Sequence, residues 1–432
     1  MDRRHFVSSV ALGAAAYSRI LGANERINVG IIGAGGQGRG DWGRFIKQPE
    51  VNPVAVCDVY RPHLEKALAT ANGRAQGYKD FRKLLERKDV DAVIVATPDH
   101  WHAIPTIMAC QAGKDVYVEK PLALTIKEGR AMVNAARKYQ RVVQTGSQQR
   151  SGEHYARAVE LIRGGKLGKI AHITAGHIRN SMPGFGRYKD EPPPPELDWD
   201  MWLGPAPSRP YNKLRCIYNF RWFWDYSGGQ MTNWGAHNLD IARWAMNVRS
   251  PISVAAFGGR FALDDGGETP DVQEVIYQFP GFVLTWSVRE MNGMSSGGFD
   301  FHGTKGNLSL SRGGFKVTAE KWATTDDAEE TGKKKKVDKD DKKKMTEEMT
   351  DPGSEQPVAH VRNFLDCVKS RKRPNADVEE GHLSAILCHL GNIATRLGRS
   401  LKWDAEKEEI VGDGDANRWL SKEYRKPWVL PV

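Results

Sequence analysis

The chain has 432 residues, a length typical of two or three domains, and 40% of them are hydrophobic, enough for more than one buried core. Charged residues make up 27%, which excludes wholesale disorder, and no apolar run reaches the roughly 18 residues of a membrane-spanning helix. The net charge of +10 and the 13 tryptophans point to two different sites, a surface for a polyanion or an aromatic-lined pocket.

Residues 1–23 resemble a twin-arginine export signal. Arg3, Arg4 and Phe6 precede a short apolar stretch, Val10–Ala16, which is too short to cross a bilayer. An ordinary amphipathic N-terminus is the alternative. The signal predicts export through the twin-arginine pathway, to the periplasm or another extracytoplasmic location. Because that pathway carries folded proteins, a cofactor bound in the cytoplasm would travel with the protein.

A strand, a glycine-rich turn and a helix follow the leader. The strand is expected at Ile27–Ile32, the helix at Asp41–Lys47, and a second strand at Pro53–Val59. The turn fits the pattern G-x-G-x-x-G with Gly33, Gly35, Gly36, Gln37 and Gly38. This order is typical of dinucleotide binding, because the glycines let the backbone approach a pyrophosphate at a helix N-terminus. The alternative is a glycine turn without a ligand.

Asp58 lies at the end of the second strand, twenty residues after Gly38. A carboxylate at this position is placed to accept hydrogen bonds from the adenosine ribose hydroxyls. It disfavours a 2′-phosphate, so we expect NAD as the cofactor and NADP less. Arg61 lies nearby and weakens that preference.

Strands and helices alternate up to residue 148, which predicts a mostly parallel sheet with helices on both faces. We therefore expect an N-terminal dinucleotide-binding domain over residues 24–148. Ligands of such sheets bind at the carboxyl ends of the strands. The residues expected to contact the cofactor there are Thr97, Pro98, His102, Glu119, Lys120 and Gln148.

Several motifs together resemble the Gfo/Idh/MocA oxidoreductases. They are Gly33–Gly38, Ala96-Thr97-Pro98, Glu119-Lys120-Pro121, Asp198–Pro205, Gly229–Asp240 and Cys388–Asn392. The resemblance implies an α/β protein with an N-terminal Rossmann domain. It also implies a C-terminal α/β domain, here residues 149–432, with an open and largely antiparallel sheet. Members of the family often pair through that sheet, so a homodimer or homotetramer is expected.

One predicted helix, Asn233–Met246, carries polar residues on a single face. Asn233, His237, Asp240 and Trp244 are spaced as neighbours along a helix, which is unusual for a purely packed element. By resemblance, His237 is the acid/base candidate and Asp240 binds substrate hydroxyls or orients the site. Lys120 would orient the substrate and stabilise a developing alkoxide. The ordinary alternatives are a core histidine and a lysine at a strand end.

Asn233 departs from the family pattern, which has aspartate at this position. A carboxylate would make the histidine more basic, whereas a neutral amide does not. His237 is then a weaker base, Lys120 takes more of the proton transfer, or the reaction is not simple alcohol oxidation. The sequence leaves these three readings open.

The expected activity is hydride transfer between NAD and a hydroxyl carbon of a sugar, polyol or glycoside. Free NAD is scarce outside the cytoplasm, so export suggests a tightly held cofactor in a redox-neutral cycle. The alternative is an NAD-dependent glycosidase or lyase that oxidises the sugar only transiently. A third reading is a sugar-binding scaffold with a vestigial nucleotide site, against which the retained Lys120 and His237 argue.

The charged segment 326–351 contains eight lysines and ten acidic residues, so we expect a mobile loop and no nucleic-acid surface. The five cysteines are widely spaced and lack a C-x-x-C pair, which predicts buried free thiols and no metal site. Six of the 13 tryptophans fall between Trp199 and Trp244. Flat aromatic faces suit sugar rings, so they favour a carbohydrate pocket over a polyanion surface.

Overall fold

The computed structural model describes residues 26–294, 298–324, 334–353 and 355–431. The expected export signal at residues 1–23 lies outside this part of the chain, as do residues 326–333 of the charged segment.

Within the described residues, six parallel strands form the first sheet, in the order β3-β2-β1-β4-β5-β6. This order is that of a Rossmann domain and confirms the predicted N-terminal fold. The central strands are short runs of Val, Ile and Ala buried on both faces, as expected where helices cover a parallel sheet. The strands are β1 (Ile27–Ile32), β2 (Val51–Cys57), β3 (Gln76–Tyr78), β4 (Ala92–Val95), β5 (Asp115–Val118) and β6 (Val143–Thr145).

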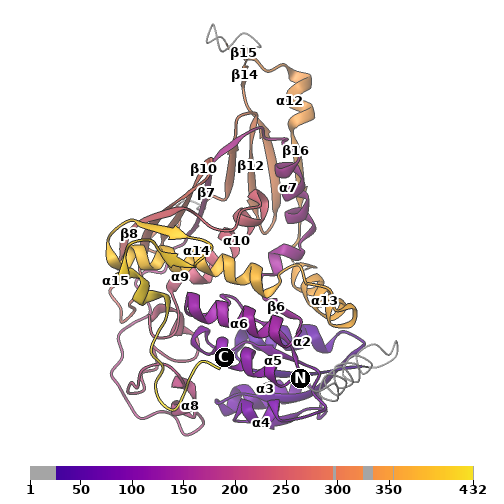
Figure 1. The fold of residues 1–432 in the computed structure, drawn as a ribbon, viewed down its shortest axis with the longest axis vertical. Helices are drawn as coiled ribbons and strands as arrows, with labels where there is room; N and C mark the ends of the chain where they lie inside the picture. Colours follow the sequence, from indigo (N-terminus) through magenta and orange to yellow (C-terminus); the bar gives the residue numbers. More distant parts are fainter. Residues whose placement is uncertain (1–25, 295–297, 325–333, 354, 432) are drawn as a thin grey trace, which may run out of the picture.

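Five helices from the same part of the chain flank this sheet. Thr125 caps one of them, since its hydroxyl accepts a hydrogen bond from the Glu128 N–H at 3.2 Å. A helix from far along the chain, α13 (Glu355–Ser370), also packs on the sheet and buries Phe364 and Leu365 against it (Figure 1). The five local helices are α2 (Gly36–Ile46), α3 (Arg61–Thr70), α4 (Phe81–Leu85), α5 (Ala103–Gln111) and α6 (Ile126–Lys138).

The second sheet has ten strands in the described residues, in the order β16-β13-β12-β11-β7-β10-β9-β8-β17-β18. Only β10 and β7 pair in parallel, so the prediction of an open, largely antiparallel sheet is confirmed. The strands are β7 (Ile170–Ile178), β8 (Ser253–Gly259), β9 (Val272–Phe279), β10 (Phe282–Arg289), β11 (Asp300–Gly303), β12 (Gly306–Ser311), β13 (Gly314–Ala319), β16 (Glu347–Thr350), β17 (Leu401–Asp404) and β18 (Glu409–Ile410).

Helices cover one face of this second sheet. Along β9 and β10 every second side chain is buried, so one face packs into the core and the other faces outward. The covering helices are α7 (Glu153–Arg163), α10 (Gly235–Met246) and α14 (Val378–Leu397). Helix α14 also packs against α6, so it lies between the two sheets (Figure 1). The remaining short helices are α8 (Trp199–Leu203), α9 (Gly229–Asn233) and α15 (Gly414–Asn417).

Parts of the charged segment 326–351 form regular structure where a loop was expected. Residues 334–336 form β15, which pairs with β14 (Trp322–Thr324), and α12 (Lys339–Met345) follows. Strand β16 then pairs with β13 in the main sheet. Edge pairing satisfies backbone groups whatever the side-chain charge, and the Asp338 side chain caps α12, so a charged composition did not prevent regular structure.

No helix in the described ranges combines the length and the apolar character that a membrane crossing requires.

Candidate active site

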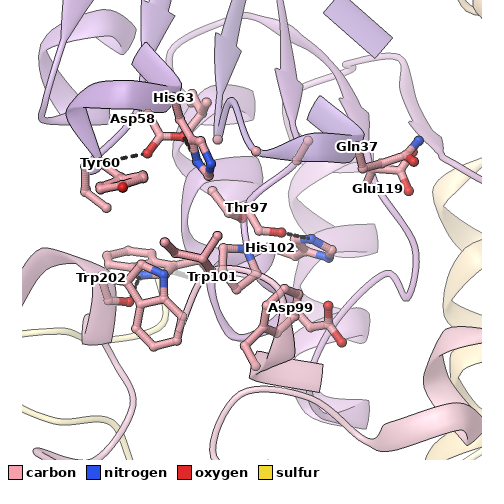
Figure 2. Close-up of a pocket in the computed structure, with 18 of the residues that line it drawn as sticks. Gln37, Asp58, Tyr60, His63, Thr97, Asp99, Trp101, His102, Glu119 and Trp202 are labelled. Atoms are coloured by element: carbon pink, nitrogen blue, oxygen red, sulfur yellow. Dashed lines mark hydrogen bonds and ion pairs between the residues drawn. The ribbon is translucent and has the colours of Figure 1, made fainter. Parts of the chain in front are cut away.

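A cavity of about 430 Å³ opens at the carboxyl ends of the first sheet's strands. Figure 2 shows Asp58 and Tyr60 at one end of it and Gln37 and Glu119 at the other, with Thr97 and His102 between them. The irregular chain between β7 and α9 forms the opposite wall. This position is the one expected for ligands of doubly wound sheets.

The glycine turn lies against the cavity wall, and Gly33, Gly35, Gly36 and Gln37 line it. Gly33 has a φ of +89°, and a Cβ there would lie 2.6 Å from the Thr97 backbone nitrogen, so only glycine lets β1 and β4 approach this closely. Gly38 is buried beneath the turn, where a Cβ would overlap the Gly33 carbonyl oxygen.

The outer side of the turn is open, which fits a bound pyrophosphate. A Cβ at Gly36 would meet nothing within 4 Å. Helix α2 begins at Gly36, and no side chain caps its first N–H groups. Free N–H donors at a helix N-terminus are the usual binding site for a phosphate group. The residues present therefore fit a dinucleotide.

Asp58 follows β2 and lines the far end of the cavity, as predicted. Its carboxylate accepts hydrogen bonds from the backbone N–H of Ala34 at 2.7 Å and of Tyr60 at 2.8 Å. It thus ties the glycine turn to the next loop while keeping lone pairs for ribose hydroxyls. The Arg61 guanidinium turns to Glu196 at 3.2 Å, so it is already paired with a carboxylate.

The other strand ends divide into residues that reach the cavity and one that does not. Thr97, Pro98 and His102 line it, whereas Gln148 does not. Both His102 ring nitrogens face carbonyl oxygens, that of Pro121 at 2.7 Å and that of Thr97 at 2.9 Å (Figure 2). These two contacts place the ring between the ends of β4 and β5, so His102 acts as a brace between the two strand ends.

Glu119 lines the cavity beside Gln37, whose amide donates to it at 3.4 Å (Figure 2). Its carboxyl group is buried with that of Asp41 on α2, and the same Gln37 amide donates to Asp41 at 3.2 Å. Burial raises the pKa of Glu119, and burial followed by the neighbouring Glu119 holds the pKa of Asp41 well above its usual value. A proton shared by the two carboxyl groups removes much of their negative charge.

Lys120 extends from the end of β5 into the cavity, and Asn233 holds its amino group. The Lys120 Nζ donates to the Asn233 side-chain oxygen at 3.0 Å and to its backbone carbonyl at 3.2 Å. Burial lowers the pKa of Lys120 below its usual value, and Arg221 and Arg312 lower it further, against the opposing effect of Glu119.

The predicted single helix over residues 233–246 is wrong. Helix α9 ends at Asn233, and α10 begins at Gly235. In a continuous helix the His237 N–H would bond to the Asn233 carbonyl, but it bonds instead to the Trp234 carbonyl at 3.0 Å. The Asn233 carbonyl accepts from Lys120, so the interruption places both Asn233 acceptors beside the lysine.

His237 lies behind the cavity and is not among the residues that line it. Its ring is 3% exposed, and its Nδ1 is buried without a hydrogen-bond partner. Burial, followed by the positive charges of Lys120 and Arg312, holds the pKa of His237 well below its ordinary value. The ring is therefore neutral near neutral pH, and it is a weak base.

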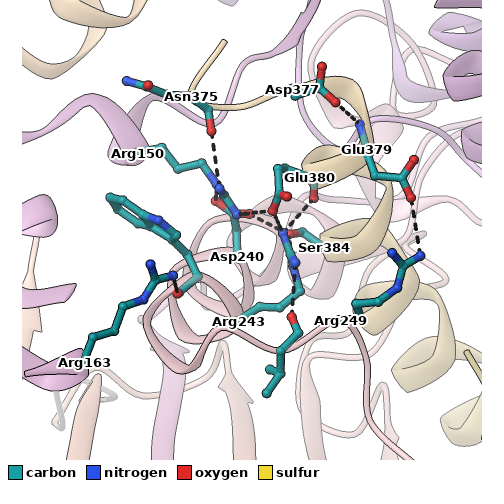
Figure 3. Close-up of polar contacts among 12 residues, drawn as sticks. Arg150, Arg163, Asp240, Arg243, Arg249, Asn375, Asp377, Glu379, Glu380 and Ser384 are labelled. Carbon is teal, nitrogen blue, oxygen red and sulfur yellow. Dashed lines mark hydrogen bonds and ion pairs between the residues drawn. The ribbon is translucent and has the colours of Figure 1, made fainter. Parts of the chain in front are cut away.

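Asp240 is not among the residues that line the cavity, and its expected role, binding substrate hydroxyls or orienting the site, stays a prediction. Figure 3 shows its carboxylate against Arg150, which donates to it at 2.8 and 2.9 Å, and against Ser384, whose hydroxyl donates at 2.6 Å. Arg150 also pairs with Glu380, as does Arg243. The side chain is 1% exposed, so Asp240 is a structural ion-pair partner that joins α10 to α14 and to the segment after β6.

Several residues that line the cavity had no assigned role in the sequence. Asp99 and Ser227 face each other there, and the Ser227 hydroxyl donates to the Asp99 carboxylate. The position of Asp99 just after a strand end could have revealed it. Tyr218 and Arg221 come from the irregular segment, whose aromatic residues bury themselves in a cluster of their own with Trp202, and no local pattern points them at a cavity.

Two family profiles match the chain. One describes an oxidoreductase family with an NAD-binding Rossmann fold, Gfo/Idh/MocA, and matches residues 27–147. The other describes the C-terminal alpha/beta domain of the same family and matches residues 168–262 and 328–430.

A curated relative and two solved structures extend the comparison. A glycosyl hydrolase family 109 protein of Shewanella pealeana is 30% identical over 179 residues, which is 39% of this chain and 39% of that protein. Levoglucosan dehydrogenase in complex with NADH and levoglucosan superposes with a TM-score of 0.65 at 17% identity, covering 88% of this chain and 99% of that one. Aldose-aldose oxidoreductase of Caulobacter crescentus, complexed with glycerol, gives 0.62 at 21% identity, covering 88% and 100%. At these identities the structural likeness is one of fold.

Proposed function

The chain belongs to the Gfo/Idh/MocA oxidoreductase family and carries its NAD-binding Rossmann domain, and on this premise we propose that it is an NAD-dependent oxidoreductase of sugars, polyols or glycosides. One observation carries the proposal most strongly. Lys120, a half-buried amine with a lowered pKa, lies in the same cavity as the open glycine turn. A proton acceptor beside a nucleotide site is what alcohol oxidation requires.

Different residues around the cavity would bind different parts of the cofactor. The turn at Gly35 and Gly36 would bind the pyrophosphate, and Asp58 the adenosine ribose. Because Arg61 is paired with Glu196, it offers no free charge for a 2′-phosphate, which supports NAD over NADP. When bound, NAD accepts the hydride that leaves the substrate carbon.

Lys120 is the group placed to receive the hydroxyl proton. In its neutral form the amine takes the proton from the substrate oxygen while the carbon–hydrogen bond breaks, and it becomes an ammonium ion. In the reverse direction the ammonium donates the proton to the forming alkoxide. Asn233 orients the amine through two hydrogen bonds without adding negative charge. His237 lies behind the cavity and has a lowered pKa, so it does not act as the main base.

A single-turnover experiment tests the proposal. Sugars and glycosides are mixed with nucleotide-loaded protein, and reduction of the nicotinamide is followed by its near-ultraviolet absorbance. Lys120→Met should slow this reduction by about a thousandfold, the loss typical of a removed general base, while nucleotide binding persists. Lys66→Met, an exposed lysine on α3, serves as the matched control and should react like the parent protein. Equal rates for the two variants would contradict the role of Lys120.

We further propose that the protein is exported by the twin-arginine pathway and works with a tightly held cofactor. The support is the Arg3-Arg4 sequence of the leader and the scarcity of free NAD outside the cytoplasm. One substrate would be oxidised and a second reduced, so the nucleotide returns to its starting state. Denaturing the purified protein should release about one nucleotide per chain. A protein that is purified without nucleotide and turns over only with added NAD would contradict this cycle.

A glycosidase or lyase with transient oxidation of the sugar is the second candidate. The observation in its favour is the similarity to the glycosyl hydrolase family 109 proteins over about two fifths of the chain. Product analysis separates the two functions. An oxidoreductase leaves a keto sugar or lactone, whereas the glycosidase leaves a cleaved glycosidic bond and no net reduced nucleotide.

A further inference from the structure

The lysine end of the cavity contains a second cation that the proposed chemistry does not use. Arg221 comes from the single helical turn Asn219–Trp222 and lines the cavity together with Lys120. Its guanidinium donates to the Tyr218 carbonyl at 2.6 Å, and it packs 4.3 Å from the Tyr218 ring centre and 5.0 Å from that of Phe220. Among the described residues, no carboxylate forms an ion pair with it or with Lys120.

Other arginines on the same segment are neutralised, which makes Arg221 an exception. Arg179 pairs with the buried Glu290, Arg209 with Asp225 at 2.9 Å, and Arg215 with Glu268 at 3.0 Å. A guanidinium that is partly withdrawn from water without a carboxylate is costly unless a ligand supplies one. The unpaired donors of Arg221 therefore suggest that the ligand is negatively charged.

The acidic groups that face Arg221 and Lys120 do not cancel this charge. Asp99 is buried and is already hydrogen-bonded to Ser227, and burial raises its pKa. Arg312, stacked 4.4 Å from the Trp234 ring centre, does not line the cavity, but its positive charge lowers the pKa of Lys120, and it has no carboxylate partner of its own in the described chain. This end of the cavity is thus cationic.

The backbone next to Arg221 is held in a strained conformation. Ile217 has a φ of +59°, which is rare for a β-branched residue, and its side chain and that of Tyr218 border the cavity. Glu268 anchors the segment on both sides, since it pairs with Arg215 and accepts from the Trp224 N–H at 3.1 Å. Strain maintained by surrounding contacts is typical of functional positions. Arg221 is therefore positioned before any ligand arrives.

We propose that the substrate is a sugar acid, whose carboxylate is bound by Arg221 while its reacting hydroxyl faces Lys120. The inference rests on the proposed oxidoreductase function and names the substrate class of that same site. Guanidinium and carboxylate match as a bidentate pair, and the partly apolar wall of Ile217 and Tyr218 suits a ring face. The carboxylate takes no part in the reaction. The carbon that carries the hydroxyl group loses a hydride to NAD, and the hydroxyl proton goes to Lys120.

Matched substrate pairs provide the test. Nucleotide-loaded protein is mixed with glucuronate and glucose, galacturonate and galactose, and gluconate and glucitol, and kcat/KM for nicotinamide reduction is measured. The acid of at least one pair should exceed its neutral counterpart by tenfold or more. Arg221→Gln should lower kcat/KM for that acid by about a hundredfold, mainly by raising KM. It should change kcat/KM for the neutral sugar less than threefold. Arg221→Lys should fall between, because it keeps the charge and loses the bidentate geometry.

A control variant and the contrary outcomes complete the design. Arg187→Gln removes an exposed arginine that pairs with Asp264 outside the cavity and should change neither member of a pair. Preference for neutral sugars, or for sugar phosphates over sugar acids, would overturn the proposal. An equal loss of kcat/KM for the acid and for its neutral counterpart in the Arg221→Gln variant would also overturn it. If that variant does not fold, the ratio of kcat/KM for the acid to kcat/KM for the neutral sugar in the parent protein decides. Failure of every sugar, with nucleotide binding intact, would instead contradict the oxidoreductase function.

Discussion

Lys120 and Asn233 show how one residue determines the chemistry of another. The asparagine donates no proton to the lysine and adds no negative charge, yet its two oxygens hold the amine in place. Without a carboxylate partner the ammonium form gains little, so burial keeps the pKa of Lys120 lowered. The amide that departs from the family pattern thus fits a lysine that works as the base.

Asn233→Asp should move the pH profile in a defined direction. The new carboxylate stabilises the ammonium form and raises the pKa of Lys120, whereas the neutral amine is the form that accepts the proton. The ascending limb of kcat for oxidation should therefore move to higher pH, by about one unit for an opposite charge at this range. Asn247→Asp, at the far end of α10, adds the same charge away from the cavity and should leave the limb in place. A shift to lower pH would contradict Lys120 as the base.

At the scale of elements, the junction of β1 and α2 has two glycines with different tasks. Gly38 makes room for the Gly33 carbonyl inside the turn, whereas Gly36 faces open space at the start of the helix. The first is required by the fold, and the second leaves room for a ligand. Sequence spacing marks both positions but does not separate these roles.

Substitution by alanine should separate them. Gly38→Ala forces a methyl group into the Gly33 carbonyl, so the turn must open, and both stability and nucleotide binding should fall. Gly36→Ala should change the free energy of unfolding by no more than about 1 kcal/mol, since alanine favours a helix. It should weaken NAD binding about tenfold, because the methyl group fills the space left for the ligand. Urea unfolding and nucleotide titration measure the two effects. Unchanged NAD affinity in Gly36→Ala would exclude the turn as the pyrophosphate site.

At the scale of the whole molecule, a buried ion-pair network joins elements from distant parts of the chain. Figure 3 shows Arg150, Asp240, Arg243 and Glu380 in mutual contact, drawn from the segment after β6, from α10 and from α14. The helix α14 also packs on α6 of the first domain. The network therefore sets the position of α10 relative to the nucleotide domain.

Asp240→Asn should act on stability and not on the chemical step. Removing the carboxylate leaves the buried Arg150 charge with weaker compensation, which typically costs about 3 kcal/mol. Urea unfolding should show this loss, while single-turnover reduction below the transition changes less than threefold. Asp264→Asn breaks an exposed pair with Arg187 and should leave unfolding unchanged. A stable Asp240→Asn protein that has lost its activity would restore Asp240 to the catalytic site.

Much of the architecture follows from local sequence alone. Strand β1 occupies Ile27–Ile32, the residues expected from the sequence, and Thr125 caps the start of α6. These features depend on neighbouring residues, whose periodicity and hydrogen-bonding groups are visible in the sequence. The glycine turn and the strand ends are predictable for the same reason.

The tertiary structure decided the features that depend on contacts between distant residues. The predicted helix is interrupted between α9 and α10, where the Asn233 carbonyl accepts from Lys120. The Asp240 carboxylate pairs with Arg150, and Gln148 is not among the residues that line the cavity. Arg221 enters the cavity because the irregular segment folds around its own aromatic cluster. Periodicity indicates which face of an element is buried, but it does not identify the residue with which a polar side chain on that face pairs. The sequence by itself therefore determined the nucleotide fold, and only the folded chain decided which charged groups line the cavity.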